Sequence, residues 1–336
     1  MNKNIKKWMA ILIAILGLLL LSVFIALSIG ELNFTLPELI HIFQSKKGIE
    51  YSILLNIRVP RIILAFAVGG ALSTSGLVLQ AVYRNPLVEP YTLGISGGAA
   101  LSVAISIVFG LNTYFSVLSL PIFGIIGASL TIVFMYAISM RRSHLNINSI
   151  LLTGVMLSFI SSSAIMFLLS TTTSEKLQTI IFWTMGSLDE TNTSLIYLVL
   201  IASLSGLVIF YLFVSQLNAL RLGEKNAKYL GINTSFVIKS LFIVASIITG
   251  ISVATVGVIG FVGLVVPHLL RFLIGNDYRI LLISTFLGGG IFLILSDVIA
   301  RKIIAPNELP IGVITGIIGG VVFIIAISKS KKLLKF

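Results

Sequence analysis

The residues best able to do chemistry in an apolar environment lie at the C-terminal end of one short apolar segment. Residues 260–271 form an apolar run that ends in Pro267, His268 and Arg271. Proline, imidazole and guanidinium groups are costly in hydrocarbon and need water or protein partners. The run is too short to cross a bilayer comfortably, yet nine other apolar segments surround it in the sequence. This pattern indicates a polytopic membrane protein with a transport function.

A second chemical pattern is the sequence Gly-Ile-Ser-Gly-Gly at residues 94–98, which matches the G-x-S-x-G motif of serine hydrolases. A nucleophile elbow needs a strand, a sharp turn and a helix, whereas this segment opens an apolar helix. His268 is the only distant base that could activate Ser96. We therefore favour a glycine-rich helix start that faces a neighbouring helix or a pore. An intramembrane serine hydrolase remains the weaker alternative.

Other catalytic or cofactor chemistry has little support in the sequence. No Walker A motif and no H-E-x-x-H motif occurs, and the absence of cysteine excludes thiolate metal sites. His41 and His144 are isolated, so we predict neither a metal site nor a cofactor. Asp297 is the one carboxylate deep in a span, and Arg301 four residues later predicts an ion pair. Such scarcity of buried ionisable groups argues against an ion-coupled secondary transporter.

Composition sets the fold class. The chain is 57% hydrophobic and 10% charged, with a mean hydropathy of +1.11, and a soluble fold could not hide that much apolar surface. A bilayer requires roughly 20 apolar residues per helix. We predict an all-α membrane protein with one domain, residues 1–336, and ten transmembrane helices. The predicted spans are 8–29, 62–81, 93–109, 114–140, 149–169, 194–214, 236–256, 258–273, 280–300 and 311–327, of which the third and eighth are short.

The basic residues predict the orientation. With the N-terminus in the cytoplasm, only seven of the 23 Lys and Arg residues lie outside. These seven are Lys46, Lys47, Arg58, Arg61, Lys176, Arg301 and Lys302. Ten spans return the C-terminus to the cytoplasm as well. The net charge of +12 is therefore mainly a topology signal, and we expect no nucleic-acid binding.

Two loops are longer than a hairpin needs: an outer loop at 30–59, and a polar cytoplasmic loop at 215–235 that we predict to be helical. In the cytoplasmic loop, Gly223 can end one short helix and Glu224 can begin the next. A small apolar face there consists of Ala227, Leu230 and Gly231. Small residues suit insertion into a protein groove better than into lipid. We predict a docking surface for another protein.

Small residues also recur along several spans. Gly69, Ser73 and Gly76 share one face of the second span, residues 288–290 are three consecutive glycines, and Gly312, Gly316 and Gly320 are spaced by four. Close backbone approach drives helix association in lipid. Packing within the chain is the favoured interpretation, and a ridge for a dimer partner is the alternative.

Six short motifs together give the chain a family resemblance. They lie at residues 58–61 (Arg-Val-Pro-Arg), 85–90 (Asn-Pro-Leu-Val-Glu-Pro), 93–99, 223–231, 260–271 and 308–312. In order and spacing, the chain resembles the membrane permease of ABC importers for iron–siderophores, haem and cobalamin, the FecCD type. The sequence departs from the family at Val88-Glu89, where alanine followed by an acidic residue is frequent, and this change looks harmless.

The resemblance implies a type II importer permease in the cell membrane that is not itself an enzyme. It implies two cytoplasmic ATP-binding subunits, an extracytoplasmic binding protein or lipoprotein, and a second permease copy, either identical or different. A ferric siderophore is the first expectation for the substrate, and haem or cobalamin the alternative.

By resemblance, three groups of residues have functional roles. Gly223, Glu224, Ala227, Leu230 and Gly231 would form the segment that couples to the ATPase. Arg58, Arg61 and Arg301 would dock the binding protein. Asn146, Ile147 and Asn148 would form a cytoplasmic gate.

Overall fold

The fold is a bundle of helices. The computed structural model describes residues 3–113, 118–140 and 147–329, and no strand occurs among them. The helices are α1 Lys3–Ser28, α2 Leu36–Ser45, α3 Ile49–Ile53, α4 Val59–Tyr83, α5 Ile95–Val108, α6 Ser119–Met140, α7 Ile147–Thr171, α8 Ser174–Met185, α9 Thr193–Leu212, α10 Val214–Leu220, α11 Glu224–Tyr229, α12 Thr234–Val256, α13 Val262–Ile274, α14 Tyr278–Lys302 and α15 Ile311–Lys329.

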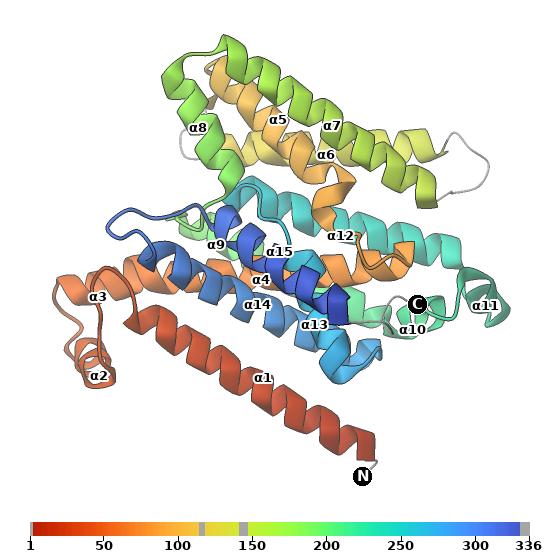
Figure 1. The fold of residues 1–336 in the computed structure, drawn as a ribbon, viewed down its shortest axis with the longest axis horizontal. Helices are drawn as coiled ribbons and strands as arrows, with labels where there is room; N and C mark the ends of the chain where they lie inside the picture. The colour runs from red at the N-terminus through yellow and green to blue at the C-terminus, as the bar shows by residue number, and fades with distance from the viewer. Residues whose placement is uncertain (1–2, 114–117, 141–146, 330–336) are drawn as a thin grey trace.

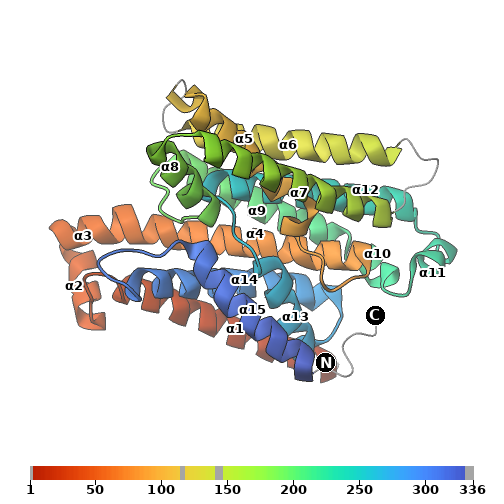
Figure 2. The ribbon, with the colours of Figure 1, turned by 45° about the horizontal axis from the view of Figure 1, so that its top comes forward.

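The bundle has two distinct ends. Helices α4, α9, α12 and α14 form its centre, α5 to α8 pack on one side, and α1 lies against α14 on the other (Figures 1 and 2). The start of α1, the end of α15 and the α10–α11 hairpin gather at one end, called here the α11 end (Figure 1). Helices α2 and α3 project at the opposite end, the α2 end. Both ends of the described chain thus lie on one side, as an even number of spans requires.

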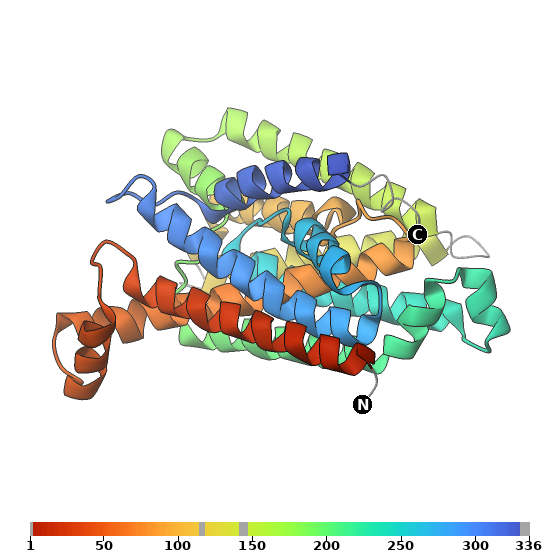
Figure 3. The same ribbon diagram turned by 60° about the horizontal axis from the view of Figure 1, so that its bottom comes forward.

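All ten predicted spans coincide with helices, but they are not equally long. In the described part of the chain, seven helices are long and apolar enough to cross a membrane, and three apolar helices are shorter: α5, α13 and the segment Ile311–Ile325 of α15. The 13 residues of α13 rise only about 20 Å, less than the bilayer core of about 30 Å. Part of that crossing is therefore made by the non-helical residues 257–261 (Figure 3).

The predicted outer loop at 30–59 is wrong in its second half. The second span begins not at residue 62 but at Ile49, and one apolar helical stretch runs to Tyr83. Within it, Leu54–Arg58 form a π-helical turn just before Pro60. Proline lacks an N–H and collides with the carbonyl four residues earlier, and a wider turn relieves both problems.

Two helices outside the cytoplasmic loop have no counterpart among the predictions: α2, which lies in the predicted outer loop, and α8. Helix α8 has 12 residues and carries Glu175 and Lys176 in its first turn, so it is too short and too polar for a search based on apolar spans. It packs against α5, on the side of the bundle where α5 to α7 lie (Figure 1).

Small residues hold the centre together, as the sequence predicted. A Cβ atom on Gly69 would collide with the carbonyl of Gly289, so α4 and α14 cross backbone to backbone at this point. Next to the crossing, the Ser73 hydroxyl donates to the Thr285 carbonyl at 2.8 Å. In the last span, only some of the glycines pack within the chain. Gly312 packs against the Met185 carbonyl, whereas a Cβ on Gly316 would meet nothing within 4 Å.

Candidate functional site

At the α2 end, three ion pairs of Arg61 connect helix α4 to three other segments of the chain. Its Nε lies 2.8 Å from Oδ1 of Asp297, its Nη2 2.8 Å from Oε2 of Glu308, and its Nη1 3.9 Å from Oδ1 of Asp189. The other oxygen of Asp297 accepts from Nε of Arg301 at 3.0 Å, which confirms the predicted pair. Because Asp297 is only 2% exposed, it needs both partners.

The other two arginine contacts fix the end of α1. Arg58 donates to the carbonyls of Leu27 and Leu32 and lies over the ring of Phe34, 4.7 Å from its centroid. Arg301 donates to the carbonyl of Ile29 at 3.3 Å. The last carbonyls of a helix have no hydrogen-bond donor within the helix. The two guanidinium groups therefore supply donors to the carbonyls at the C-terminal end of α1, which ends at Ser28.

The predicted docking residues Arg58, Arg61 and Arg301 therefore converge, around a cavity of about 270 Å³. Their guanidinium groups are largely buried, however. The side chains of Arg61 and Arg301 are each 9% exposed, whereas those of Asp189 and Glu308 are 66% and 44% exposed. Carboxylates rather than guanidinium groups are the accessible charges of this site. Docking by the arginines stays a prediction, and it requires them to exchange partners.

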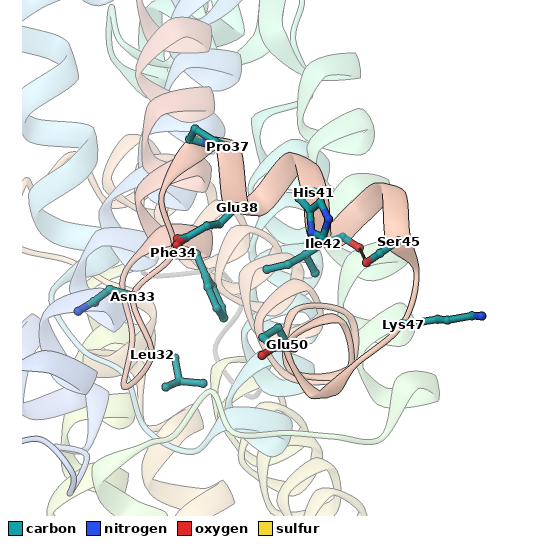
Figure 4. Close-up of a pocket in the computed structure, with 10 residues that line it drawn as sticks. All are labelled: Leu32, Asn33, Phe34, Pro37, Glu38, His41, Ile42, Ser45, Lys47 and Glu50. Carbon is teal, nitrogen blue, oxygen red and sulfur yellow. Dashed lines mark hydrogen bonds between the residues drawn. The ribbon is translucent and has the colours of Figure 1, made fainter.

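A second cavity at this end, of about 680 Å³, lies along α2 and the loop before it (Figure 4). Glu38 and His41 line it, but Glu38 is already used in the fold. Its carboxylate accepts from the Thr35 backbone N–H at 2.7 Å. Hydrogen bonds from the backbone and side chain of Thr35 lower the pKa of Glu38. The carboxylate thus caps α2 and is not a free ligand-binding group.

At the α11 end, the predicted coupling residues form a compact hairpin. Gly223 has φ +107° and lies between α10 and α11, as predicted for a residue that separates two helices. Glu224 pairs with Lys228 at 2.8 Å and accepts from the Thr234 hydroxyl at 3.3 Å. These contacts tie the start of α11 to the start of α12.

The predicted apolar face of this hairpin is wrong in one residue. Ala227 is fully buried inside the hairpin, so it cannot enter a groove of another protein. The exposed apolar side chains are instead Leu222 at 59%, Tyr229 at 87% and Leu230 at 64%. We call these three residues the hairpin knob. Tyr229 is the last residue of a helix of only six residues.

Hydrogen bonds connect this hairpin to the membrane part through α10. Asn218 donates to Oδ1 of Asp277 at 3.2 Å and accepts from the Tyr278 N–H at 3.1 Å. Arg221 donates to the Asn276 carbonyl at 3.0 Å. Asn276 and Asp277 lie in the turn between α13 and α14, and Tyr278 is the first residue of α14. Sequence reasoning missed this connection because it joins segments about sixty residues apart.

The remaining predicted sites give no catalytic centre. Asn146 of the predicted gate lies outside the described residues, as do the side chains of Ile147 and Asn148 at the start of α7. No hydrogen bond joins Ser96 to His268 in the described structure, and the glycines beside Ser96 pack against α6 and α7, as favoured above. Nor do the described residues include three His, Asp or Glu side chains grouped to hold a metal ion.

Comparison with known proteins assigns this arrangement to a family. Residues 18–329 match the FecCD transport family. The chain is 37% identical to the hemin transport system permease protein of Yersinia pestis, over 94% of this chain and 95% of that protein. It is 36% identical to the vitamin B12 import system permease protein of Vibrio vulnificus, over 95% and 94%.

A solved structure agrees over almost the whole length. It is an inward-facing transporter assigned to the metal-chelate type of ABC transporter, and it is 31% identical to this chain. The two structures superimpose with a TM-score of 0.86 over 96% of this chain and 99% of the other. Sequence, helix arrangement and these relatives lead to one conclusion: the chain belongs to the FecCD transport family and is an ABC importer permease.

Proposed function

We propose that the chain is the permease subunit of an ATP-driven importer that moves a ferric siderophore from an extracytoplasmic binding protein into the cytoplasm. The observation that carries this proposal is the hairpin knob. Leu222, Tyr229 and Leu230 expose apolar surface at the end of the bundle, on a hairpin that is hydrogen-bonded to the membrane helices. Exposed apolar groups held on a rigid support are typical of a docking surface.

The orientation follows from the charges at the two ends. The connections at the α11 end carry Arg84, Arg221, Lys225, Lys228 and Arg279. Since basic residues favour the cytoplasmic side, the α11 end and both termini are cytoplasmic. The knob then faces two cytoplasmic ATP-binding subunits, which hydrolyse the nucleotide, and this chain transmits their movement.

A second permease copy is expected on the α15 side. Ile317, Val321 and Ile324 are 63%, 53% and 69% exposed, and the adjacent Gly316 has open space at its Cβ position. This face is smooth and apolar, as helix association in lipid requires. An identical copy is the simplest partner, since an interface related by a two-fold axis needs one surface only. A different permease is the alternative.

At the α2 end, the binding protein would meet the arginine site. Acidic groups of that protein can replace Glu308 and Asp189 as partners of Arg61, which leaves the total number of ion pairs unchanged. Such an exchange contributes to orientation and association rate more than to affinity.

The substrate class rests on the relatives. Two are named for hemin and vitamin B12, and the solved structure is assigned to a metal-chelate type. Each name refers to a metal held within an organic ligand. A ferric siderophore fits this class, and haem and cobalamin are the alternatives within it.

The test is purification of the tagged chain from its native membrane, followed by reconstitution with the proteins that accompany it. A stoichiometric Walker-motif ATPase and ATP-dependent uptake into liposomes are the expected results. Radiolabelled ferric siderophore, haem and cobalamin are then compared as substrates. Uptake without any ATPase would contradict the proposal and favour a secondary transporter.

A further inference from the structure

Helix α13 has an unusual position, because it begins inside the bundle and ends at the α11 end. Gly263, in the first turn of α13, packs against Leu72 and Gly76, in the C-terminal half of the 25-residue helix α4. Left-handed residues lie on both sides of α13: Gly257 at φ +74° and Phe261 at +68° before it, and Gly275 at +93° after it. Figure 3 shows α13 as a short helix between two non-helical connections.

The inner end of α13 is held by a buried carboxylate. Glu89 is 6% exposed, and its Oε2 accepts from the backbone N–H of Phe261 at 3.1 Å. Phe261 is the residue just before α13, and non-glycine residues rarely adopt its left-handed conformation. The N–H in this partly buried connection requires a partner, and the Glu89 carboxyl group supplies it. Glu89 therefore fixes both the position and the conformation of this connection.

Helix α4 supports the same point. The Gln80 side-chain amide donates to the Gly263 carbonyl at 3.1 Å, and the Cβ that Gly263 lacks would lie 2.8 Å from the Leu72 carbonyl. Pro90, next to Glu89, touches the same glycine. The first turn of α13 is thus enclosed by α4 and by the connection between α4 and α5.

The other end of α13 is bonded to the hairpin that carries the knob. Asn218 and Arg221 of the α10 segment hold Asp277, Tyr278 and Asn276, the residues that directly follow Gly275. One short helix therefore lies between the α10–α11 hairpin and a fixed point inside the membrane part.

We propose that α13 acts as a lever that carries the movement of the α10–α11 hairpin into the membrane, with Glu89 as the positioning residue at its pivot. This inference rests on the proposed function, in which ATPase subunits move the hairpin. When Asn218 and Arg221 are displaced, the α13–α14 turn follows them. Since Glu89 and Gln80 hold the opposite end, α13 tilts instead of shifting along its axis. The tilt changes the backbone conformation of the connection at 257–261.

A probe beside the pivot can test this movement. The chain contains no cysteine, so a Gly260→Cys variant takes a nitroxide spin label at one site, and a Cβ there meets nothing within 4 Å. The labelled chain is reconstituted with its ATPase subunits in nanodiscs, and its EPR spectrum is recorded with and without Mg-ATP. We expect ATP to change the spectrum. Asn218→Ala, which lies far from the label, should reduce this change at least about threefold, since the lever loses its attachment.

Transport measurements test the pivot itself. Glu89→Ala should lower uptake per ATP hydrolysed about tenfold, which corresponds to the loss of one hydrogen bond. Glu89→Gln keeps an acceptor and should lower this ratio much less. Glu175→Gln, an exposed glutamate on α8, is the matched control and should change nothing. A purely structural role of Glu89 would instead reduce folded protein, or lower uptake and ATP hydrolysis in equal proportion.

The outcomes separate the lever from the proposed function. If the parent chain binds no ATPase, the proposed function is wrong. If it binds the ATPase and imports substrate, but the label responds equally with and without Asn218→Ala, only the lever is overturned. The same holds if the effects of Asn218→Ala and Glu89→Ala on uptake per ATP multiply as independent changes, because two ends of one lever must be coupled.

Discussion

Asp297 shows how one buried carboxylate organises the α2 end. It is 2% exposed and lies between the guanidinium groups of Arg61 and Arg301, which come from different helices. The sequence predicted the pair with Arg301, because four residues separate the two on one helix. The pair with Arg61 joins residues 236 positions apart, and no sequence spacing predicts it. Local partners were therefore predictable here, and long-range partners were not.

Removal of this carboxylate should destabilise the fold. We expect Asp297→Asn to cost about 3–5 kcal/mol, because two arginines keep buried charges without a full counter-charge. Glu308→Gln removes a half-exposed partner of Arg61 and should cost about 0–1 kcal/mol. Thermal unfolding in mild detergent measures both. Equal effects of the two substitutions would show that Asp297 is not the centre of the network.

At the other end, burial corrects the predicted role of Ala227. The sequence placed Ala227 on the small apolar face that was predicted to dock with another protein. Because Ala227 is fully buried, Ala227→Leu should overpack the hairpin and destabilise it by about 1–3 kcal/mol.

Tyr229, in contrast, should matter for docking. At 87% exposure it contributes little to the fold, and an aromatic residue at the centre of an interface often contributes about 2 kcal/mol or more to binding. We expect Tyr229→Ala to weaken association with the ATPase at least about tenfold while the melting temperature stays constant. Size-exclusion chromatography and titration with the purified ATPase check this. Lys225→Ala, in the same hairpin, serves as the control. Unchanged association would exclude Tyr229 from the interface.

Among the elements, the apolar spans were predicted, including the short helices α5 and α13, whereas the polar helix α8 and local changes in helix geometry were not. A span such as α12 is apolar over its whole length, so its existence and limits follow from bilayer thickness. Helix α8 and the π-helical turn at Leu54–Arg58 depend on neighbours and on Pro60, which apolar windows do not register. Likewise the sequence placed Arg58 and Arg61 at the outer end but could not indicate that α1 and Asp297 cover them.

The crossing of α4 and α14 gives a prediction at this scale. Gly289→Val should prevent these helices from approaching, since a Cβ there would collide with the Gly69 carbonyl. We expect a large loss of folded, monodisperse protein. Gly316→Ala should leave the fold unaffected, because its Cβ position is open. Fluorescence-detected size-exclusion chromatography compares the two. A well-folded Gly289→Val protein would mean that the helices do not cross here as closely as described.

For the whole molecule, the exposed face of α15 predicts an assembly. In an otherwise cysteine-free chain, Val321→Cys should form a disulfide between two copies in oxidised native membranes. Tyr197→Cys, on the lipid-exposed surface of α9, is the matched control and should remain monomeric. Mobility on a denaturing gel without reductant distinguishes the disulfide-linked dimer from the monomer. A crosslink at Tyr197 but not at Val321 would place the interface on another face.

The contacts of α1 have a consequence for how the protein is made. The N-terminal helix is held by α14 and by Arg58 and Arg301, and Ser28 and Tyr278 are 250 residues apart in the chain. At about 5–20 residues per second, a ribosome needs roughly 12–50 s to supply the intervening chain. For that time α1 must persist in the bilayer as a separate helix, before its partner exists. The apolar surface of α1 after Lys7 remains mostly unburied in the finished bundle, so the helix is stable in lipid without its partner.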